Sequence, residues 1–292
     1  MKTINYVIFG MVLIGMMAAT MGLDMEKSSA KAIYYEDKAI VLVYHDVCKN
    51  LKSGESNSST VTSAQFQDHL QMLNNRGFHI ISMDDFITFM LHGKSIPPNS
   101  VVLTFDDGYT SFYTEAFPIL RRFGAPAFNF IVGMTSDLFN PDAEMHLNWE
   151  QMREMKAYGM GFYNHTYNLH RTVSADRTGT QKPALTTSMY LEQRQRPETE
   201  EEHRKRIFSD LSFLEKRFEQ EIGKQHKLLA FPYGAYNDVV LEEGAKAGME
   251  LFFTVEEGIN EPGSRIVKRI NAGEPYVSAD HLWNQMKKFF WK

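Results

Sequence analysis

A buried strand that ends in two acids is encoded by Val101-Val102-Leu103-Thr104-Phe105-Asp106-Asp107-Gly108. Such an apolar run is typical of α/β proteins, which build their active sites at the carboxyl ends of their strands. Adjacent side chains on an extended strand point to opposite faces, so Asp106 and Asp107 can share one site only if the chain turns there. Gly108 permits that turn. Function is therefore expected at this end of the strand.

The acid pair has two interpretations. One carboxylate could bind a metal while the other acts as a base, or both could form the turn and N-cap of a helix that begins near Tyr109. The first interpretation is favoured by Asn164-His165-Thr166-Tyr167-Asn168-Leu169-His170, which follows another apolar stretch. Histidines five residues apart lie about 140° apart on a helix, so they converge on one ion only across a loop or a helix start. Two imidazoles and one carboxylate would form a facial site with open positions for water and substrate.

A third apolar strand runs into a turn at Leu228-Leu229-Ala230-Phe231-Pro232-Tyr233-Gly234. Proline fixes its own φ and glycine permits unusual ones, so Tyr233 could be held with its backbone N–H aimed into the site. Such a donor would suit an oxyanion hole. The alternative is an ordinary turn before a helix capped at Asn237.

A fourth strand, Ile40-Val41-Leu42-Val43-Tyr44-His45-Asp46, also ends in ionisable residues. His45 could protonate a leaving group near neutral pH, with Asp46 or another carboxylate orienting its ring. It could equally be a structural histidine whose nitrogens are satisfied inside the fold. The sequence leaves both possibilities open.

Taken in this order, the four segments resemble the polysaccharide deacetylase family (NodB-like, carbohydrate esterase family 4). The resemblance is strongest to bacterial poly-β-1,6-N-acetylglucosamine N-deacetylases and covers roughly residues 38–272. It rests on residues 104–108 combined with His165-Thr166 and His170, and on residues 231–234. The segment 147–152, which contains Trp149, agrees as well and makes Trp149 a possible supporting residue.

This resemblance implies a set of catalytic roles. Asp107, His165 and His170 would hold a divalent metal ion, and zinc is the expected ion for two nitrogens and one oxygen. Asp106 would be the general base and His45 the general acid. The backbone N–H of Tyr233 would share the tetrahedral oxyanion with the metal before acetate is released.

The sequence departs from the family pattern at two places. Many members carry an arginine two positions before the proline, where this chain has Ala230, so another group must orient Asp106. Arg269 is a candidate, because a guanidinium binds a carboxylate in a fixed fork. Asn164 stands where a serine is expected, and Phe162-Tyr163 are bulkier than the usual pair.

The whole sequence predicts an α/β fold. Strand-like runs alternate with helical patterns, which favours a mostly parallel sheet closed into a distorted (β/α) barrel of the NodB-like type. The runs lie near residues 39–44, 78–82, 101–105, 127–132, 160–163, 228–231, 250–255 and 265–270. Capping boxes are expected at Thr62–Gln65 and Ser82–Asp85.

Three other stretches are harder to interpret. Residues 172–197 lack periodicity and could either roof a saccharide groove or form a floppy insertion. The acidic run from Glu198 to Glu202 is expected to open a helix with a solvated face. The end of the chain, 276–292, predicts a final helix packed on the barrel, with membrane contact as the alternative.

The amino terminus bears on location. Residues 6–23 are apolar and uncharged, so residues 1–32 are expected to be a signal peptide or membrane anchor with a short linker, and residues 33–292 the deacetylase domain. The protein would then be exported, either secreted or attached to the extracellular face of the membrane. A net charge of −5 argues against nucleic acid as a partner.

The expected function is metal-dependent N-deacetylation of a surface glycan built from N-acetylglucosamine, with the biofilm polysaccharide poly-β-1,6-N-acetyl-D-glucosamine as the first candidate. A peptidoglycan or chitin deacetylase and an O-acetyl esterase are alternatives within the same enzyme class. A non-catalytic glycan-binding relative is the alternative from another class.

Overall fold

The computed structural model describes residues 32–51, 58–138, 142 and 144–290. Contacts divide the chain into Met1–Ala32 and Ile33–Lys292, and the architecture given below is that of the second unit. The expected signal peptide or anchor lies, except for Ala32, outside the described residues. No helix in the described part of the chain combines the length and the apolar character needed to cross a membrane.

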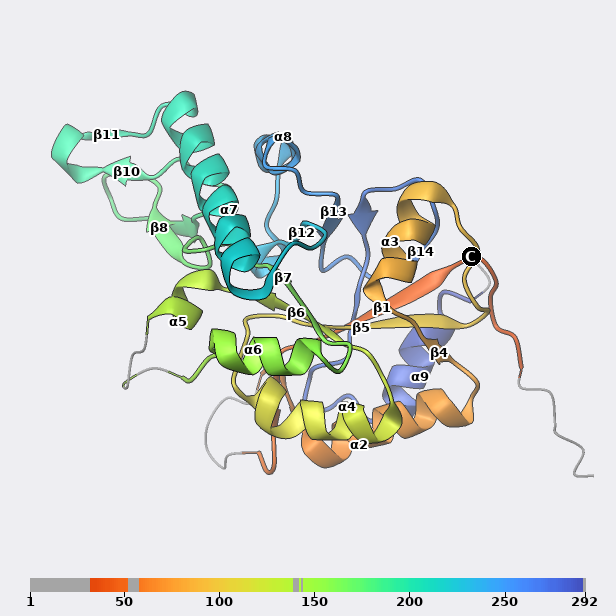
Figure 1. The fold of residues 1–292 in the computed structure, drawn as a ribbon. Coiled ribbons are helices and arrows are strands. Elements are labelled where there is room, and N and C mark those ends of the chain that lie inside the picture. Colours follow the sequence, from red (N-terminus) through yellow and green to blue (C-terminus); the bar gives the residue numbers. More distant parts are fainter. Residues whose placement is uncertain (1–31, 52–57, 139–141, 143, 291–292) are drawn as a thin grey trace, which may run out of the picture. The chain divides into compact units, whose positions relative to one another are not determined.

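Strands and helices alternate along most of the chain (Figure 1). The strands are β1 (Ala39–Tyr44), β2 (Asp46–Cys48), β3 (Thr60–Thr62), β4 (His79–Ile80), β5 (Ser100–Phe105), β6 (Phe128–Ile131), β7 (Gly161–Asn164), β8 (Thr172–Ser174), β9 (Gln181–Pro183), β10 (Tyr190–Leu191), β11 (Arg196–Pro197), β12 (Leu228–Ala230), β13 (Leu251–Phe253), β14 (Ile259–Asn260), β15 (Ile266–Val267) and β16 (Ile270–Asn271). The helices are α2 (Ser63–Asn75), α3 (Met83–His92), α4 (Phe117–Phe123), α5 (Gly133–Asp137), α6 (Trp149–Lys156), α7 (Glu200–Ile222), α8 (Asp238–Lys246) and α9 (Ala279–Lys287), with short helical turns η1 (Phe112–Ala116), η2 (Glu192–Arg194) and η3 (Pro232–Gly234).

The main sheet is a nearly closed parallel barrel, as the sequence predicted. Its strands run in the order β1, β5, β6, β7, β12, β13 and β15, each parallel to the next. β15 pairs with β13, and β16, three residues further along, pairs in parallel with β1. One short segment therefore bridges the first and last strands, and the carboxyl ends of the strands meet at one mouth. β14 pairs antiparallel to β1.

The apolar runs form strands because they are buried on both faces. Every residue of β1 and of β5 is buried. Along each strand, every second side chain points into the barrel and packs there with helix α3. The side chains between them point outward and are covered by the other helices. A third cluster fills the space between β12, β13 and helices α7 and α8. This double burial explains why the strands read as continuous hydrophobic runs.

The two expected helix starts are present, with one difference. Thr62 and Ser82 each cap their helix by accepting a hydrogen bond from the backbone N–H three residues on. The Gln65 side chain, however, donates to the carbonyl oxygens of Glu274 and Val277 instead of returning to Thr62. The capping box expected at Thr62 is therefore wrong in its second half, because a tertiary contact takes the glutamine.

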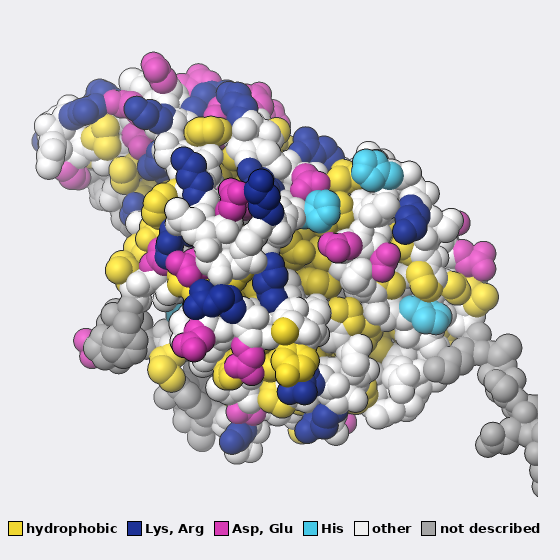
Figure 2. Space-filling view, viewed as in Figure 1, with side chains coloured by type: hydrophobic (Ala, Val, Ile, Leu, Met, Phe, Trp, Pro, Cys, Tyr) yellow, Lys and Arg dark blue, Asp and Glu magenta, His cyan; other side chains and the backbone are white. Residues whose placement is uncertain are grey.

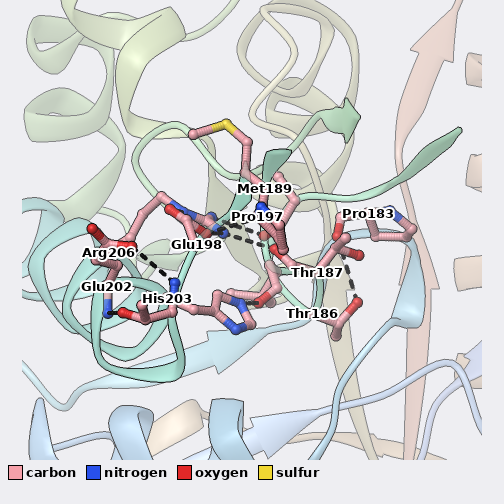
Figure 3. Close-up of polar contacts among 12 residues, drawn as sticks. Pro183, Thr186, Thr187, Met189, Pro197, Glu198, Glu202, His203 and Arg206 are labelled. Atoms are coloured by element: carbon pink, nitrogen blue, oxygen red, sulfur yellow. Dashed lines mark hydrogen bonds and ion pairs between the residues drawn. The ribbon is translucent and has the colours of Figure 1, made fainter. Parts of the chain in front are cut away.

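Residues 172–197 are ordered into two antiparallel hairpins, β8–β9 and β10–β11, so the floppy-insertion alternative is wrong. We call these residues the arm. Glu198, which directly follows the arm, forms two hydrogen bonds with Arg206 of α7, each 2.8 Å long (Figure 3). Arg206 also donates to the carbonyl oxygens of Ala184 and Thr187. The solvated face expected for the acidic run is therefore wrong at Glu198, which is buried.

Helix α7 is amphipathic. Its inner face buries Ile207, Leu211, Leu214 and Phe218. On the face shown in Figure 2, Lys, Arg, Asp and Glu side chains intermix over α7 and the arm. The helix is thus a support that faces the barrel on one side and solvent on the other.

The final helix, α9, packs against the domain as expected. Leu282 and Met286 are fully buried in the cluster that also contains residues of α2, and Phe290 joins that cluster. Trp283 contacts the rings of Tyr34 and Phe290. Leu282, Met286 and Phe290, three of the apolar side chains that left membrane contact open, are therefore buried in the domain.

Candidate metal centre and active site

The carboxyl ends of the parallel strands surround a cavity of about 370 Å³. Five strand ends contribute to it, because parallel strands present the same end at the same mouth. The sequence-predicted residues in its lining are His45, Asp46, Asp106, Asp107, His165, His170 and Tyr233. Segments more than 180 residues apart in the chain thus meet in one site, as expected from the four strand ends.

The chain turns at the acid pair, one residue earlier than expected. Asp107 itself has a positive φ of 71°, and Gly108 follows with 77°. A positive φ is uncommon outside glycine, although aspartate adopts it more readily than most residues, and such conformations cluster at functional sites. The following helical turn begins after Ser111 and has no side-chain cap. The helix-capping interpretation of the acid pair is therefore wrong.

Asp107, His165 and His170 form the one group of potential metal ligands found in the described part of the chain. Oδ1 of Asp107 lies 3.3 Å from Nε2 of His165 and 3.1 Å from Nε2 of His170. These separations suit a small tetrahedral ion, because ligands bound at about 2.1 Å stand roughly 3.4 Å apart. Oδ1 of Asp107 is also buried with no hydrogen-bond partner among the described residues. The donor set fits a divalent cation.

The protonation states suit such an ion. His165 donates from Nδ1 to the carbonyl oxygen of Ala230 at 2.9 Å, which leaves Nε2 as the lone-pair nitrogen that faces Asp107. Burial raises the pKa of Asp107, but the adjacent His165 and His170 more than offset this and hold the pKa well below its usual range. Asp107 is therefore ionised, the form that binds a cation.

Asp106 lies in the same mouth but has a different partner. Its two carboxylate oxygens accept bonds from Nη1 and Nη2 of Arg269 at 2.7 and 2.8 Å. Both side chains are almost completely buried. Arg269 thus binds the carboxylate that the arginine missing at position 230 would have bound. Asp106 is not a member of the ligand group of Asp107, His165 and His170.

His45 and Asp46 both line the cavity but have different contacts. Nδ1 of His45 is buried without a hydrogen-bond partner in the described part of the chain. Asp46 does not hold His45: its oxygens accept from Ser111 at 2.6 Å and from Thr60 at 3.4 Å. The suggestion that Asp46 orients His45 is therefore wrong.

Trp149, the possible supporting residue, does not line the cavity. Its indole N–H donates to Asp137, 2.8 Å away, and its ring packs edge-on against Phe218. Trp149 supports the scaffold between α5, α6 and α7.

Tyr233 stands at the rim. Its backbone is left-handed, with φ 58° and ψ 13°, and its ring lies 4.6 Å from that of His170. The expected Pro-Tyr-Gly turn is present, and its unusual conformation occurs at the tyrosine. The side chain is 55% exposed, so it forms a wall that substrate can reach.

Tyr109, Glu144 and Val255 also line the cavity, and the sequence analysis missed them as site residues. The pKa of Tyr109 is raised by burial and by the charges of Asp107, Glu144 and Asp46. Tyr109 and Val255 each follow a strand end closely, which was the available signal. Glu144 follows a long connection and has no local signature.

The fold and the site define a parallel α/β-barrel protein with a candidate metal centre at the carboxyl ends of its strands. The chain belongs to the polysaccharide deacetylase family, whose model matches residues 93–252, more than half of its 292 residues. His45 and Arg269 lie outside the matched range, whereas Asp106, Asp107, His165 and His170 lie within it.

Individual relatives are similar over most of this chain. A poly-beta-1,6-N-acetyl-D-glucosamine N-deacetylase of Escherichia coli (strain K12) is 29% identical over 247 residues, 81% of this chain and 36% of that relative. The chain thus spans about a third of the length of that relative. One of the same name from Staphylococcus aureus (strain MSSA476) is 27% identical, over 82% of this chain and 79% of the relative. A solved structure of a de-N-acetylase from Aggregatibacter actinomycetemcomitans is 28% identical with a TM-score of 0.76, covering 85% of this chain and all of that one.

Proposed function

We propose that this protein hydrolyses the acetamide groups of N-acetylglucosamine units in poly-β-1,6-N-acetyl-D-glucosamine and releases acetate. The observation that carries the proposal is the pairing of two different sites in one cavity: the ligand group of Asp107, His165 and His170, and the separate carboxylate of Asp106 held by Arg269. The names of the E. coli and S. aureus relatives support the choice of glycan.

The geometry supports a role for each residue. A divalent ion held by Asp107, His165 and His170, with zinc the first candidate, would supply Lewis acidity that polarises a carbonyl and acidifies water. Asp106 is kept ionised and oriented by Arg269, so it takes a proton from the attacking water.

Two further residues complete the reaction. His45 lines the same cavity and lies close enough to Asp106 to lower the pKa of that acid, and its imidazole donates a proton to the departing sugar amine. The backbone N–H of Tyr233 stabilises the tetrahedral oxyanion. The left-handed backbone of Tyr233 supports this role, because strained conformations at residues other than glycine cluster at functional sites.

The amino-terminal segment, residues 1–32, completes the proposal as a signal peptide or membrane anchor. The domain that follows, residues 33–292, then acts outside the cell, secreted or attached to the outer face of the membrane, where the glycan is found. A glycan partner also agrees with the mixed surface charge and with a net charge of −5.

The test is acetate release by zinc-loaded protein from β-1,6-linked N-acetylglucosamine oligomers, compared with β-1,4-linked chitin oligomers and acetylated xylan. We expect a preference for the β-1,6 chain, lost on chelation and restored by zinc. His170→Ala is the matched control, since it should lose metal and activity together. Preference for chitin or xylan would move the assignment to those substrates. Bound metal with no release from any of them would favour a glycan-binding role.

A further inference from the structure

The loop that carries the two histidine ligands has one bond of its own, from the backbone N–H of Leu169 to Oγ1 of Thr166 at 3.0 Å, and is also bonded from other parts of the chain. It runs from His165 to His170 outside any helix or strand, and Thr166 within it has a positive φ of 71°. A β-branched residue with positive φ is strained, so contacts from elsewhere must maintain this conformation. The loop sets the positions of both imidazoles, and what holds its backbone therefore sets the geometry of the metal centre.

Asp210 of helix α7 holds the middle of this loop. Its Oδ1 accepts a hydrogen bond from the backbone N–H of Tyr167 at 2.7 Å, and its Oδ2 accepts from that of Asn168 at 2.8 Å. One carboxylate thus binds two consecutive amides that lie between His165 and His170. Bonds to an ionised acceptor are among the stronger hydrogen bonds in proteins, and this pair ties the middle of the loop to α7.

Asn164 fastens the start of the same loop to the same helix. Its Oδ1 accepts from the backbone N–H of Thr166 at 2.8 Å, while its Nδ2 donates to the carbonyl oxygen of Leu211 at 3.2 Å and to Glu215 at 2.9 Å. A serine, which the family pattern led us to expect here, is too short to make both sets of contacts. The asparagine therefore explains how this chain ties its metal loop to α7.

Helix α7 is itself firmly placed on both sides of Asp210. On the amino-terminal side, Arg206 forms its buried fork with Glu198 (Figure 3). On the carboxyl-terminal side, Arg217 donates to both oxygens of Asp137 at 2.7 and 3.1 Å. The helix is therefore bonded to other parts of the domain on both sides of the residue that binds the loop.

We propose that α7 positions the metal centre, acting through Asp210 and Asn164, which fix the backbone of the loop that presents His165 and His170. Asp210 touches neither substrate nor metal and is a positioning residue. The inference rests on the metal site of the proposed function, but it concerns metal affinity and can be tested without substrate. Supports of this kind alter metal affinity by about 10- to 100-fold when removed.

The experiment measures cobalt binding by the full chain, by competition with a chelator and through the absorption spectrum of the bound ion. Asp210→Ala should weaken binding by about tenfold or more and change the spectrum, because the two imidazoles are no longer held at one separation. Asp210→Asn, which has the same shape and keeps one acceptor oxygen, should lose less. Glu219→Ala is the control, since this exposed acid on the same helix lies far along it from the loop.

A second measurement separates positioning from general stability. Hydrogen exchange of the Tyr167 and Asn168 amides should quicken in Asp210→Asn without a matching change in the barrel strands. If Asp210→Ala does not fold, Asp210→Asn decides the question. Affinity within twofold of wild type in a folded Asp210 variant would overturn the inference while leaving the metal site intact. A wild-type chain that binds no cobalt would overturn the metal site and this inference together.

Discussion

Arg269 binds Asp106 through two parallel hydrogen bonds of 2.7 and 2.8 Å, buried at the carboxyl end of the barrel. A third bond, from Nε of Arg269 to the carbonyl oxygen of Thr254 at 2.8 Å, fixes the guanidinium in one orientation. Burial raises the pKa of Asp106, but the charges of Arg269 and His165 outweigh it and leave the pKa below its usual value. The proposed base is thereby both aimed and kept ionised.

Replacing Arg269 by lysine should lower kcat by about tenfold or more, because an ammonium cannot reproduce the fork. Weaker stabilisation of the carboxylate should also raise the pKa of Asp106. A base works only when ionised, so the acidic limb of the kcat/KM profile should move to higher pH. The measurement is a pH–rate profile, with Arg153→Lys at a surface ion pair as the control. An unchanged profile would remove Arg269 from this role.

Asp106→Asn should keep the metal and lose turnover by about 10²-fold or more, because the amide cannot take a proton. The matched variant Asp107→Asn should lose metal first, since Oδ1 of Asp107 faces both histidines. Metal content and acetate release are measured on the same samples. Activity of Asp106→Asn within tenfold of wild type would exclude Asp106 as the base.

His45→Ala should reduce kcat by about 10²- to 10⁴-fold, the usual value of general acid catalysis. Asp46→Asn should have a much smaller effect, because the Asp46 carboxylate bonds Ser111 and Thr60 and not His45. Rates are measured with both variants across the pH range. If His45→Ala retains the wild-type rate and profile, the proton for the departing amine comes from elsewhere.

Glu215→Gln should flatten the dependence of stability on pH. Burial raises the pKa of Glu215 from 4.5 to about 7, more than its bond from Asn164 lowers it. The folded state therefore holds a proton that the unfolded state releases, so this stabilisation is full below about pH 4.5 and is lost as pH rises through about 7. Its size is on the order of 3 kcal/mol.

Denaturant unfolding between pH 4.5 and 8 measures this effect, with Glu219→Gln as the exposed control. The free energy of unfolding of wild type should fall across this interval more steeply than that of Glu215→Gln. Parallel curves for the two proteins would show that Glu215 does not titrate with the predicted pKa.

Much of the site could be predicted from local sequence pattern. The predicted site residues lie at or shortly after the ends of apolar runs, and parallel strands deliver such residues to one mouth. They are His45, Asp106, Asp107, His165, His170 and Tyr233. The same pattern predicted the barrel, because strands buried on both faces must be continuously apolar. Local pattern gave the wrong partner where a side chain bonds a residue far away in the sequence. Gln65 bonds Val277, and Asp46 bonds Ser111.

Local sequence pattern is enough to predict the barrel, its helix starts and most of the polar residues at its mouth, since these depend on hydrophobic period and on residues a few positions apart. It did not predict Tyr109, Glu144 and Val255. Only the tertiary structure decided that Arg269 holds Asp106 across 163 positions, that Trp149 lies outside the cavity, and that Asp210 clamps the metal loop. The physical reason is that strand register and helix packing select which side chains meet, and neither leaves a local trace in the sequence.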